Sequence, residues 1–116
     1  MFPTVFKVIS TAAVRAIVDS RIGRHGEVSP AEKKPYITWQ IVADDPQLQI
    51  SGRPCTNFTA IQIDCYHSTD AGIEQLAVAV RDALDAARVA NRVVIDARDT
   101  ETRLYRVGLQ ADFIGL

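Results

Sequence analysis

The sequence predicts an α+β fold in which a mainly antiparallel sheet of about four strands carries two helices packed on one face. Two patterns support this prediction. Residues 104–114 alternate between apolar and polar side chains, as a strand with one buried face does. The apolar set of that strand is Tyr105, Val107, Leu109, Ala111 and Phe113. Residues 70–87 instead repeat their apolar side chains at three- and four-residue steps, which is the pattern of an amphipathic helix.

Residues 4–19 are expected to form the first helix, with Pro3 and Thr4 suited to its start. The apolar side chains of its predicted stripe are Val5, Val8, Ile9, Ala12, Ala16 and Ile17. This stripe should pack on the sheet. Residues 20–35 lose the periodicity and mix glycine and proline with basic side chains, which predicts a long polar loop.

Residues 36–42 alternate and predict the first strand. Ile37, Trp39 and Ile41 would share the buried face, where Trp39 would anchor the core. Residues 43–57 contain two prolines, a glycine and paired aspartates, so we expect a connection there. A short strand over residues 48–50 and a hairpin excursion both fit this segment.

The clearest strand in the middle of the chain is predicted over residues 58–66, with Thr59, Ile61, Ile63 and Cys65 on one face. The helix that follows has N-cap candidates in residues 67–70 and is expected to run to about Ala87. Residues 92–98 would place Val93, Ile95 and Ala97 on one side of a strand, and this strand should form an antiparallel hairpin with the last one.

Composition and charge predict one globular domain spanning residues 1–116. Thirteen basic and fourteen acidic side chains give a formal net charge of −1, which argues against a broad electrostatic footprint on DNA or on an anionic membrane. No apolar run reaches the roughly 18 to 20 residues that a bilayer span requires. We therefore expect a soluble protein, made in the cytoplasm, without a membrane partner.

Side chains for catalysis or metal binding do not form a recognisable pattern. His25 and His67 lie in unlike segments, and neither Cys55 nor Cys65 belongs to a Cys-x-x-Cys motif. A disulfide between the two cysteines is not expected, because Cys65 suits the inner face of its strand as a small apolar residue. We predict no catalytic residues, no cofactor and no metal site.

Arginines recur through the C-terminal half, but aspartates and glutamate are interleaved with them. A mixed-charge exposed face is the favoured interpretation, since a nucleic-acid patch would show an excess of one sign. Arg106 lies opposite the core set of its strand. It is predicted to pair with an acid on a neighbouring strand or across a subunit interface.

Several segments, taken in order, resemble the tail-completion proteins of long-tailed bacteriophages and prophages, which are also called tail terminators or head-to-tail joining proteins. The segments are Pro35-Tyr36-Ile37-Thr38-Trp39-Gln40, Ile61-Gln62-Ile63-Asp64-Cys65-Tyr66, the helix segment Leu76-Ala77-Val78-Ala79-Val80-Arg81-Asp82-Ala83-Leu84, Asp96-Ala97-Arg98-Asp99, and Leu104-Tyr105-Arg106-Val107-Gly108-Leu109-Gln110-Ala111-Asp112-Phe113. Together they cover nearly the whole chain.

The resemblance implies a structural virion protein, assembled in the host cytoplasm, that forms a ring at the head-proximal end of the tail tube. Such a ring, typically six-fold, stops tail growth and presents a surface for head-tail joining. The implied partners are further copies of the chain, the tail tube protein and a head-tail connector or stopper protein, with no sequence-specific contact to nucleic acid. Near-zero net charge would let identical subunits approach each other.

The candidate interface residues lie mainly in the two segments that we expect to be loops. They are Arg21, Arg24, Lys33, Lys34, Asp44, Asp45, Arg53 and Arg106. The alternative to a virion protein is a small monomeric binding module for nucleic acid or protein, suggested by the arginines of the C-terminal half. An enzyme is the least favoured class, because no convergent acid, base and nucleophile can be named.

Overall fold

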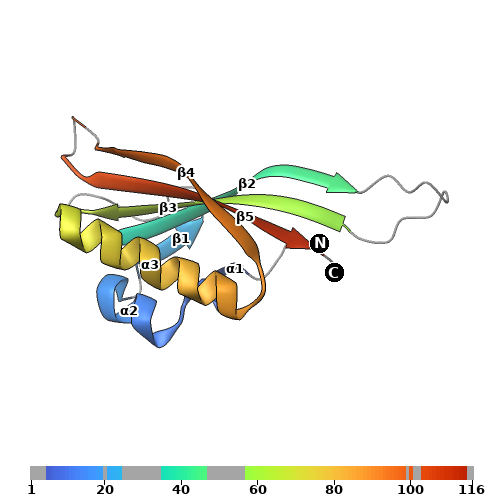
Figure 1. The fold of residues 1–116 in the computed structure, drawn as a ribbon, viewed down its shortest axis with the longest axis horizontal. Coiled ribbons are helices and arrows are strands. Elements are labelled where there is room, and N and C mark those ends of the chain that lie inside the picture. Colours follow the sequence, from blue (N-terminus) through green and yellow to red (C-terminus); the bar gives the residue numbers. More distant parts are fainter. Residues whose placement is uncertain are drawn as a thin grey trace.

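The computed structural model describes residues 5–19, 21–24, 35–46, 57–98, 100 and 103–114. Within them the chain forms three helices and five strands (Figure 1). In chain order these are α1 (Val5–Ile9), α2 (Ala12–Val18), β1 (Ile22–Arg24), β2 (Tyr36–Pro46), β3 (Asn57–His67), α3 (Asp70–Ala86), β4 (Ala90–Arg98) and β5 (Tyr105–Ile114). The predicted short strand over residues 48–50 lies outside the described residues, as does Cys55.

The strands form one sheet in the order β1-β2-β3-β5-β4. The four long strands pair antiparallel, and the hairpin predicted for the last two is confirmed. The prediction of about four strands missed β1, which pairs parallel to β2 inside the segment expected to be only a loop. At three residues β1 is too short to show an alternation in the sequence.

The predicted first helix is two short helices. The chain breaks after Ile9, and Thr11 begins α2 as its N-cap by accepting a hydrogen bond from the backbone N–H of Val14 at 3.4 Å. This break changes which side chains face the core: Val14 and Val18 are buried in α2, whereas the predicted stripe residues Ala12 and Ala16 are exposed. The error arose because a single period was carried across a helix boundary.

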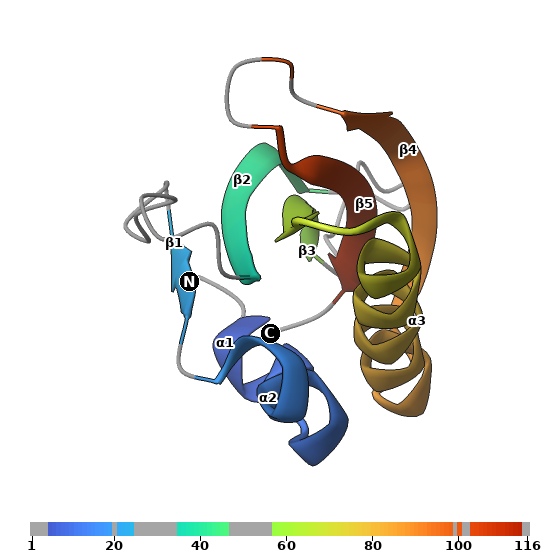
Figure 2. The same cartoon turned by 90° about the vertical axis from the view of Figure 1, so that its left-hand side faces the viewer.

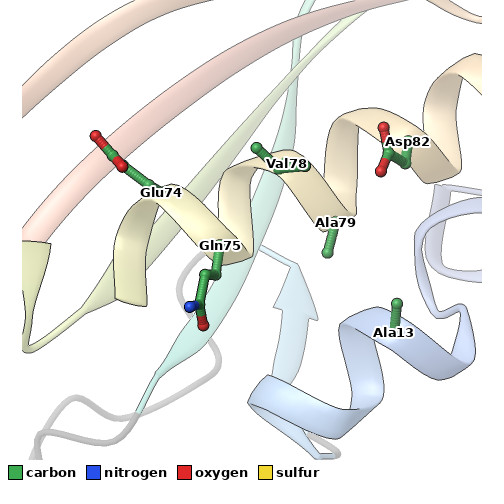
Figure 3. Close-up of a pocket in the computed structure, with 6 residues that line it drawn as sticks. All are labelled: Ala13, Glu74, Gln75, Val78, Ala79 and Asp82. Carbon is green, nitrogen blue, oxygen red and sulfur yellow. The ribbon is translucent and has the colours of Figure 1, made fainter. Parts of the chain in front are cut away.

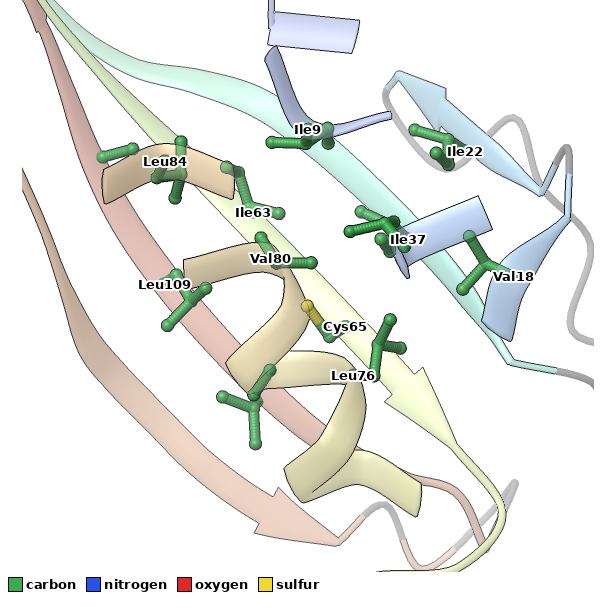
Figure 4. Packing of buried hydrophobic residues seen from close by; sticks show 14 of the residues in the cluster. Ile9, Val18, Ile22, Ile37, Ile63, Cys65, Leu76, Val80, Leu84 and Leu109 are labelled. Carbon is green, nitrogen blue, oxygen red and sulfur yellow. The ribbon is translucent and has the colours of Figure 1, made fainter. Parts of the chain in front are cut away.

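The helix α3 begins where residues 67–70 predicted it. The N-cap Thr69 accepts a hydrogen bond from the backbone N–H of Gly72 at 3.0 Å. Leu76, Val80 and Leu84 point from α3 toward the strands and are fully buried (Figure 4). They meet the side chains of β3 and β5 that the alternation assigned to the inner face, including Ile63 and Leu109.

All three helices cover one side of the sheet (Figure 2), so we call the two sides the helix face and the helix-free face. The predicted face of β2 is confirmed, since Ile37, Trp39 and Ile41 lie opposite inner residues of β3. Trp39 packs against the core but is only partly buried. In Figure 1 the distal ends of β2 and β3 extend beyond the helices, and the chain is elongated, at 51 × 28 × 21 Å.

Bulges interrupt both β2 and β4. Pairing passes from Ile41 to Ala43 and from Val93 to Ile95, so Val42 and Val94 are the extra residues. The prediction that Val93, Ile95 and Ala97 share a side is therefore wrong. Val93 lies opposite Leu109 on the helix face, whereas Ile95 lies opposite Gly108 on the other face, because one inserted residue reverses the alternation.

Candidate functional site

The helix-free face of the sheet is built in rows that cross the strands. One row joins Tyr36, Tyr66 and Arg106, which are paired in register on β2, β3 and β5. The two tyrosine rings stack with centroids 4.5 Å apart and an angle of 12° between their planes. The Arg106 guanidinium carbon lies 6.0 Å from the Tyr66 ring centroid, close enough for a cation–π attraction.

Arg106 also forms an ion pair with Asp64 of the adjacent strand. Its Nε donates to Asp64 Oδ1 at 3.3 Å and its Nη2 lies 3.2 Å from the same oxygen. Gln62 Nε2 donates to that oxygen as well, at 3.1 Å. Gly108 leaves room for the pair, because a Cβ there would stand 3.0 Å from Asp64 Oδ1 and 3.1 Å from Ile95 Cβ. The prediction that Arg106 pairs with an acid on a neighbouring strand is confirmed.

Beyond the row that contains Asp64 and Gly108, a further row of the same face is polar throughout: Gln40, Gln62, Gln110 and Arg92 lie in register across β2, β3, β5 and β4. Gln110 Nε2 donates to Asp112 Oδ1 at 3.3 Å, and Arg92 Nη1 lies 3.9 Å from Asp112 Oδ2. Asp112 therefore receives one amide hydrogen bond from its own strand and faces one arginine of β4. Arg92 is thus balanced by an acid of the neighbouring strand, while the wider mixed-charge face stays a prediction, because Asp99 and Glu101 lie outside the described residues.

The sheet has two unlike edges, one at β4 and the other at β1 and β2. On one side β4 is the last described strand, and seven of its nine residues are exposed. On the other side β1 pairs with β2 only from Ile37 to Trp39, whereas β2 continues to Pro46. Within the described residues, both β4 and the distal part of β2 therefore present an edge without a neighbouring strand.

The helix α3 stands between two grooves. One, of about 390 Å³, lies between α2 and α3, where Ala13 and Ala79 point toward each other (Figure 3). The other, of about 280 Å³, lies between α3 and β4 and is lined by Val93 and Asp96. Val78 contributes to both grooves and is 57% exposed, so α3 offers an apolar position between them.

Titratable groups in the described part of the chain do not form a reaction centre. Burial, followed by the nearby negative charge of Asp64, raises the pKa of the Cys65 thiol far above its ordinary value, so the thiol stays protonated. Burial lowers the pKa of His67, whose Nδ1 accepts the backbone N–H of Thr69 at 3.2 Å. Among the residues described, no group of three or more His, Cys, Asp or Glu is placed to hold a metal ion.

Comparison with known proteins identifies the family. The family model of tail completion protein gp17 matches residues 5–114, nearly the full chain. The chain belongs to this family. No curated protein sequence matches it significantly. Among solved structures, the chain resembles one from the virion of a native gene transfer agent particle with a TM-score of 0.66 and 16% identity, over 96% of this chain and 92% of that one.

Membership of the tail completion family makes the chain a structural component of the virion tail and not an enzyme. The family resemblance drawn from the sequence is confirmed. The similarity to the gene transfer agent chain independently supports the fold. No helix in the described ranges is both long and apolar enough to cross a bilayer.

The candidate interface residues of this tail completion protein occupy different environments. Arg21 binds within its own chain: Nε donates to the Pro35 carbonyl at 2.7 Å and Nη2 to the Ile17 carbonyl at 3.5 Å. The guanidinium carbon of Arg24, in β1, lies 5.3 Å from the Trp39 ring centroid. Both side chains thus help to join the α2–β1 region to β2.

Two of the remaining candidate residues, Asp44 and Asp45, lie in the distal part of β2, opposite Thr59 and Phe58 of β3. The segment expected to be a loop from residue 43 therefore begins as strand. The other three candidates, Lys33, Lys34 and Arg53, lie outside the described residues. The structure does not bring the described candidates together, because Arg21 and Arg24 lie near the start of β2, Asp44 and Asp45 near its end, and Arg106 on β5.

Sequence reasoning missed the bulges and the exposed valines at them. Val42 is 48% exposed and Val94 is 44% exposed. A signal was present in both places: Ile41-Val42 and Val93-Val94 are adjacent apolar pairs, which a strictly alternating strand with one buried face does not contain. Such pairs indicate either a bulge or a second apolar contact surface.

Proposed function

We propose that this protein forms a ring at the head-proximal end of the tail tube, where it terminates tail polymerisation and provides the surface for head-tail joining. The observation that carries the proposal is the family match over residues 5–114. The similar solved structure comes from the virion of a gene transfer agent particle, which supports assembly of this chain into a phage-like particle. The ring would contain six copies, each acting as a single domain of 116 residues.

The surfaces of the sheet suit such a ring. A head-to-tail contact between identical subunits needs two different surfaces, and it closes into a ring when the rotation between neighbours is right. The β4 edge and the distal β2 edge are two such surfaces on opposite sides of one sheet. The exposed side chain of Val78 lies between the two grooves of α3 and could make a further contact to a neighbouring virion protein.

The expected partners are the tail tube protein below the ring and a connector or stopper protein above it. We propose residues 21–34 and 44–57 for these contacts, together with Arg106. Arg106 already forms an ion pair with Asp64 of its own chain. In a contact with another protein it would therefore act as part of the polar helix-free face and not as an unpaired positive charge.

The experiment is electron microscopy of particles produced when the phage or prophage of origin lacks this gene, with the gene supplied from a plasmid as the control. Overlong or variable tails, separate from DNA-filled heads, would establish termination. Tails of normal length that remain unjoined would establish a joining role without termination. Infectious virions of normal appearance would refute the proposal.

The alternative of a monomeric nucleic-acid-binding module gains no support from three arginines of the C-terminal half. Arg92 and Arg106 face aspartates, and the guanidinium carbon of Arg98 lies 5.4 Å from the Tyr105 ring centroid. Salt-sensitive binding of the purified chain to DNA or RNA, together with normal virions in its absence, would favour that alternative.

A further inference from the structure

We propose that α3 docks a helix of a different virion protein, one that carries an apolar side chain between two basic side chains at four-residue steps. This helix would lie along the groove between α2 and α3. The inference rests on the proposed role in the tail and names the chemistry that recognises one partner. In this mode of recognition an amphipathic helix places apolar side chains in a groove, and charged side chains on either side set its register.

The groove between α2 and α3 has an apolar floor of small side chains. Its volume is about 390 Å³, and Ala13 of α2 and Ala79 of α3 point toward each other across it (Figure 3). Val78 also lines the groove and, at 57%, is the most exposed of the large hydrophobic side chains described. A helix seated there would come close to the two alanines and would remove the Val78 side chain from water.

Two acids flank Val78 on the same face of α3. Glu74, Val78 and Asp82 follow one another at four-residue steps, so they form one row along the helix, and all three line the groove. At a rise of 1.5 Å per residue, the two acidic positions lie about 12 Å apart along the helix axis. Both acids are exposed, and within the described residues neither carboxylate forms an ion pair or a hydrogen bond. The row is therefore apolar at its centre and negative on either side.

The arginine of α3 does not neutralise this row. Arg81 Nε donates to Asn91 Oδ1 of β4 at 2.9 Å, and Asn91 Nδ2 donates to Asp85 Oδ1 at 2.8 Å. Arg81 therefore belongs to the β4 side of α3, where it lines the other groove. Among the described residues that line the α2–α3 groove, none is basic. A partner with a positive charge on each side of an apolar side chain is complementary to this surface.

The described helices of this chain do not carry the complementary row, which argues against a second copy as the partner. The helices α1 and α2 contain five and seven residues, fewer than such a row spans, and α3 carries one arginine. Two α3 helices packed on each other would bring the acids of both copies together, and like charges at short range oppose association. The same charges would reject acidic helices of other proteins.

A titration with two synthetic helical peptides tests the chemistry of the surface. One peptide carries a leucine with a lysine four residues before it and another four residues after it, and the second peptide has glutamate in place of both lysines. We expect the lysine peptide to shift the amide resonances of α3 around Val78 and of α2 around Ala13. The glutamate peptide should bind about tenfold more weakly. Equal binding of the two peptides, or no shift in either helix, would refute the inference.

Two variants of the protein test whether the row itself makes this distinction. Glu74→Gln with Asp82→Asn removes both charges and should abolish the preference for the lysine peptide. The matched control is Ala90→Lys with Ala97→Lys, which changes the net charge equally at exposed positions of β4 and should keep the preference. Loss of the preference in both variants would show that net charge is responsible and would refute the inference. Thermal unfolding of each variant verifies that it is folded.

Photo-cross-linking in virions tests the occupant of the groove. A benzophenone amino acid replaces Val78 or, as the control, Ala97, which lies opposite Arg106 on the helix-free face. From Val78 we expect a cross-link to one other virion protein, within a helix that has the basic, apolar and basic side chains at four-residue steps. The control should give no cross-link to that helix. A cross-link from Val78 to a copy of this chain, or none in intact virions, would refute the inference.

The outcomes separate this inference from the function on which it rests. If the strain that lacks the gene produces normal virions, the proposed function fails and the docking inference fails with it. If the gene is required but Val78 does not cross-link to such a helix, the function stands and the docking inference alone is refuted.

Discussion

Replacing Arg106 with methionine tests whether the Asp64–Arg106 pair stabilises the sheet. The substitution keeps an aliphatic side chain over Tyr66 but removes both contacts to Asp64 Oδ1, at 3.3 and 3.2 Å. Removing one partner of a fully buried ion pair costs about 3–5 kcal/mol, whereas exposed pairs contribute about 0–1 kcal/mol. The side chains are 33% and 9% exposed, so we expect a loss of about 1.5–3 kcal/mol in the free energy of unfolding.

Urea denaturation measures this loss. With a slope of about 1–3 kcal/mol per molar urea, the midpoint should fall by roughly 1 M. The matched control is Arg92→Met, because the Arg92–Asp112 pair is longer, at 3.9 Å, and its arginine is 61% exposed. We expect that control to lose less than about 1 kcal/mol. Equal losses in the two variants, or additive effects of Arg106→Met and Asp64→Asn, would refute the reasoning.

Three further predictions follow from burial. Leu109→Asp should prevent stable folding because it buries an unpaired carboxylate, whereas Gln110→Asp should lose about 1 kcal/mol or less; equal loss of thermal stability would contradict the strand assignment. Burial lowers the pKa of His67, so the folded state favours the neutral ring. The free energy of unfolding should therefore be highest above pH 6.5, the ordinary pKa of histidine, and should decline as the pH falls below it. His67→Asn should remove that part of the pH dependence of unfolding. In a Cys55→Ser background, a thiol reagent at mildly alkaline pH should modify Cys65 only at the rate of unfolding, and rapid reaction of the native protein would show that the thiol is accessible.

Prediction from the sequence succeeded where one period held over a long element. The alternation of residues 105–113 identified the buried face of β5, since Val107, Leu109 and Ala111 are all buried. The same method failed at Ser10 and at Val94, where a helix break and a bulge shift the phase by less than a full period. A period read across such a point assigns the following residues to the wrong face.

Candidate site residues were harder to predict, because an interface depends on which edges remain open. Arg21 was proposed for contacts to other proteins, yet its guanidinium group binds the Pro35 and Ile17 carbonyls of its own chain. Asp44 and Asp45 were proposed as loop residues, and they prove to extend β2 past its neighbour β1. Among the described residues no strand lies against that part of β2 on the β1 side, and this could not be deduced without knowing how short β1 is.

The sequence by itself determined the position and kind of the four long strands and of α3, because apolar periodicity depends only on local backbone geometry. It also determined the family, through segments that occur in a recognisable order. Only the tertiary structure decided that β3 pairs with β5, which brings Asp64 within hydrogen-bond distance of Arg106, 42 residues later in the chain. Pairing between distant strands depends on how the whole chain closes its core, and that same closure leaves β4 and, among the described residues, the distal part of β2 as edges of the sheet.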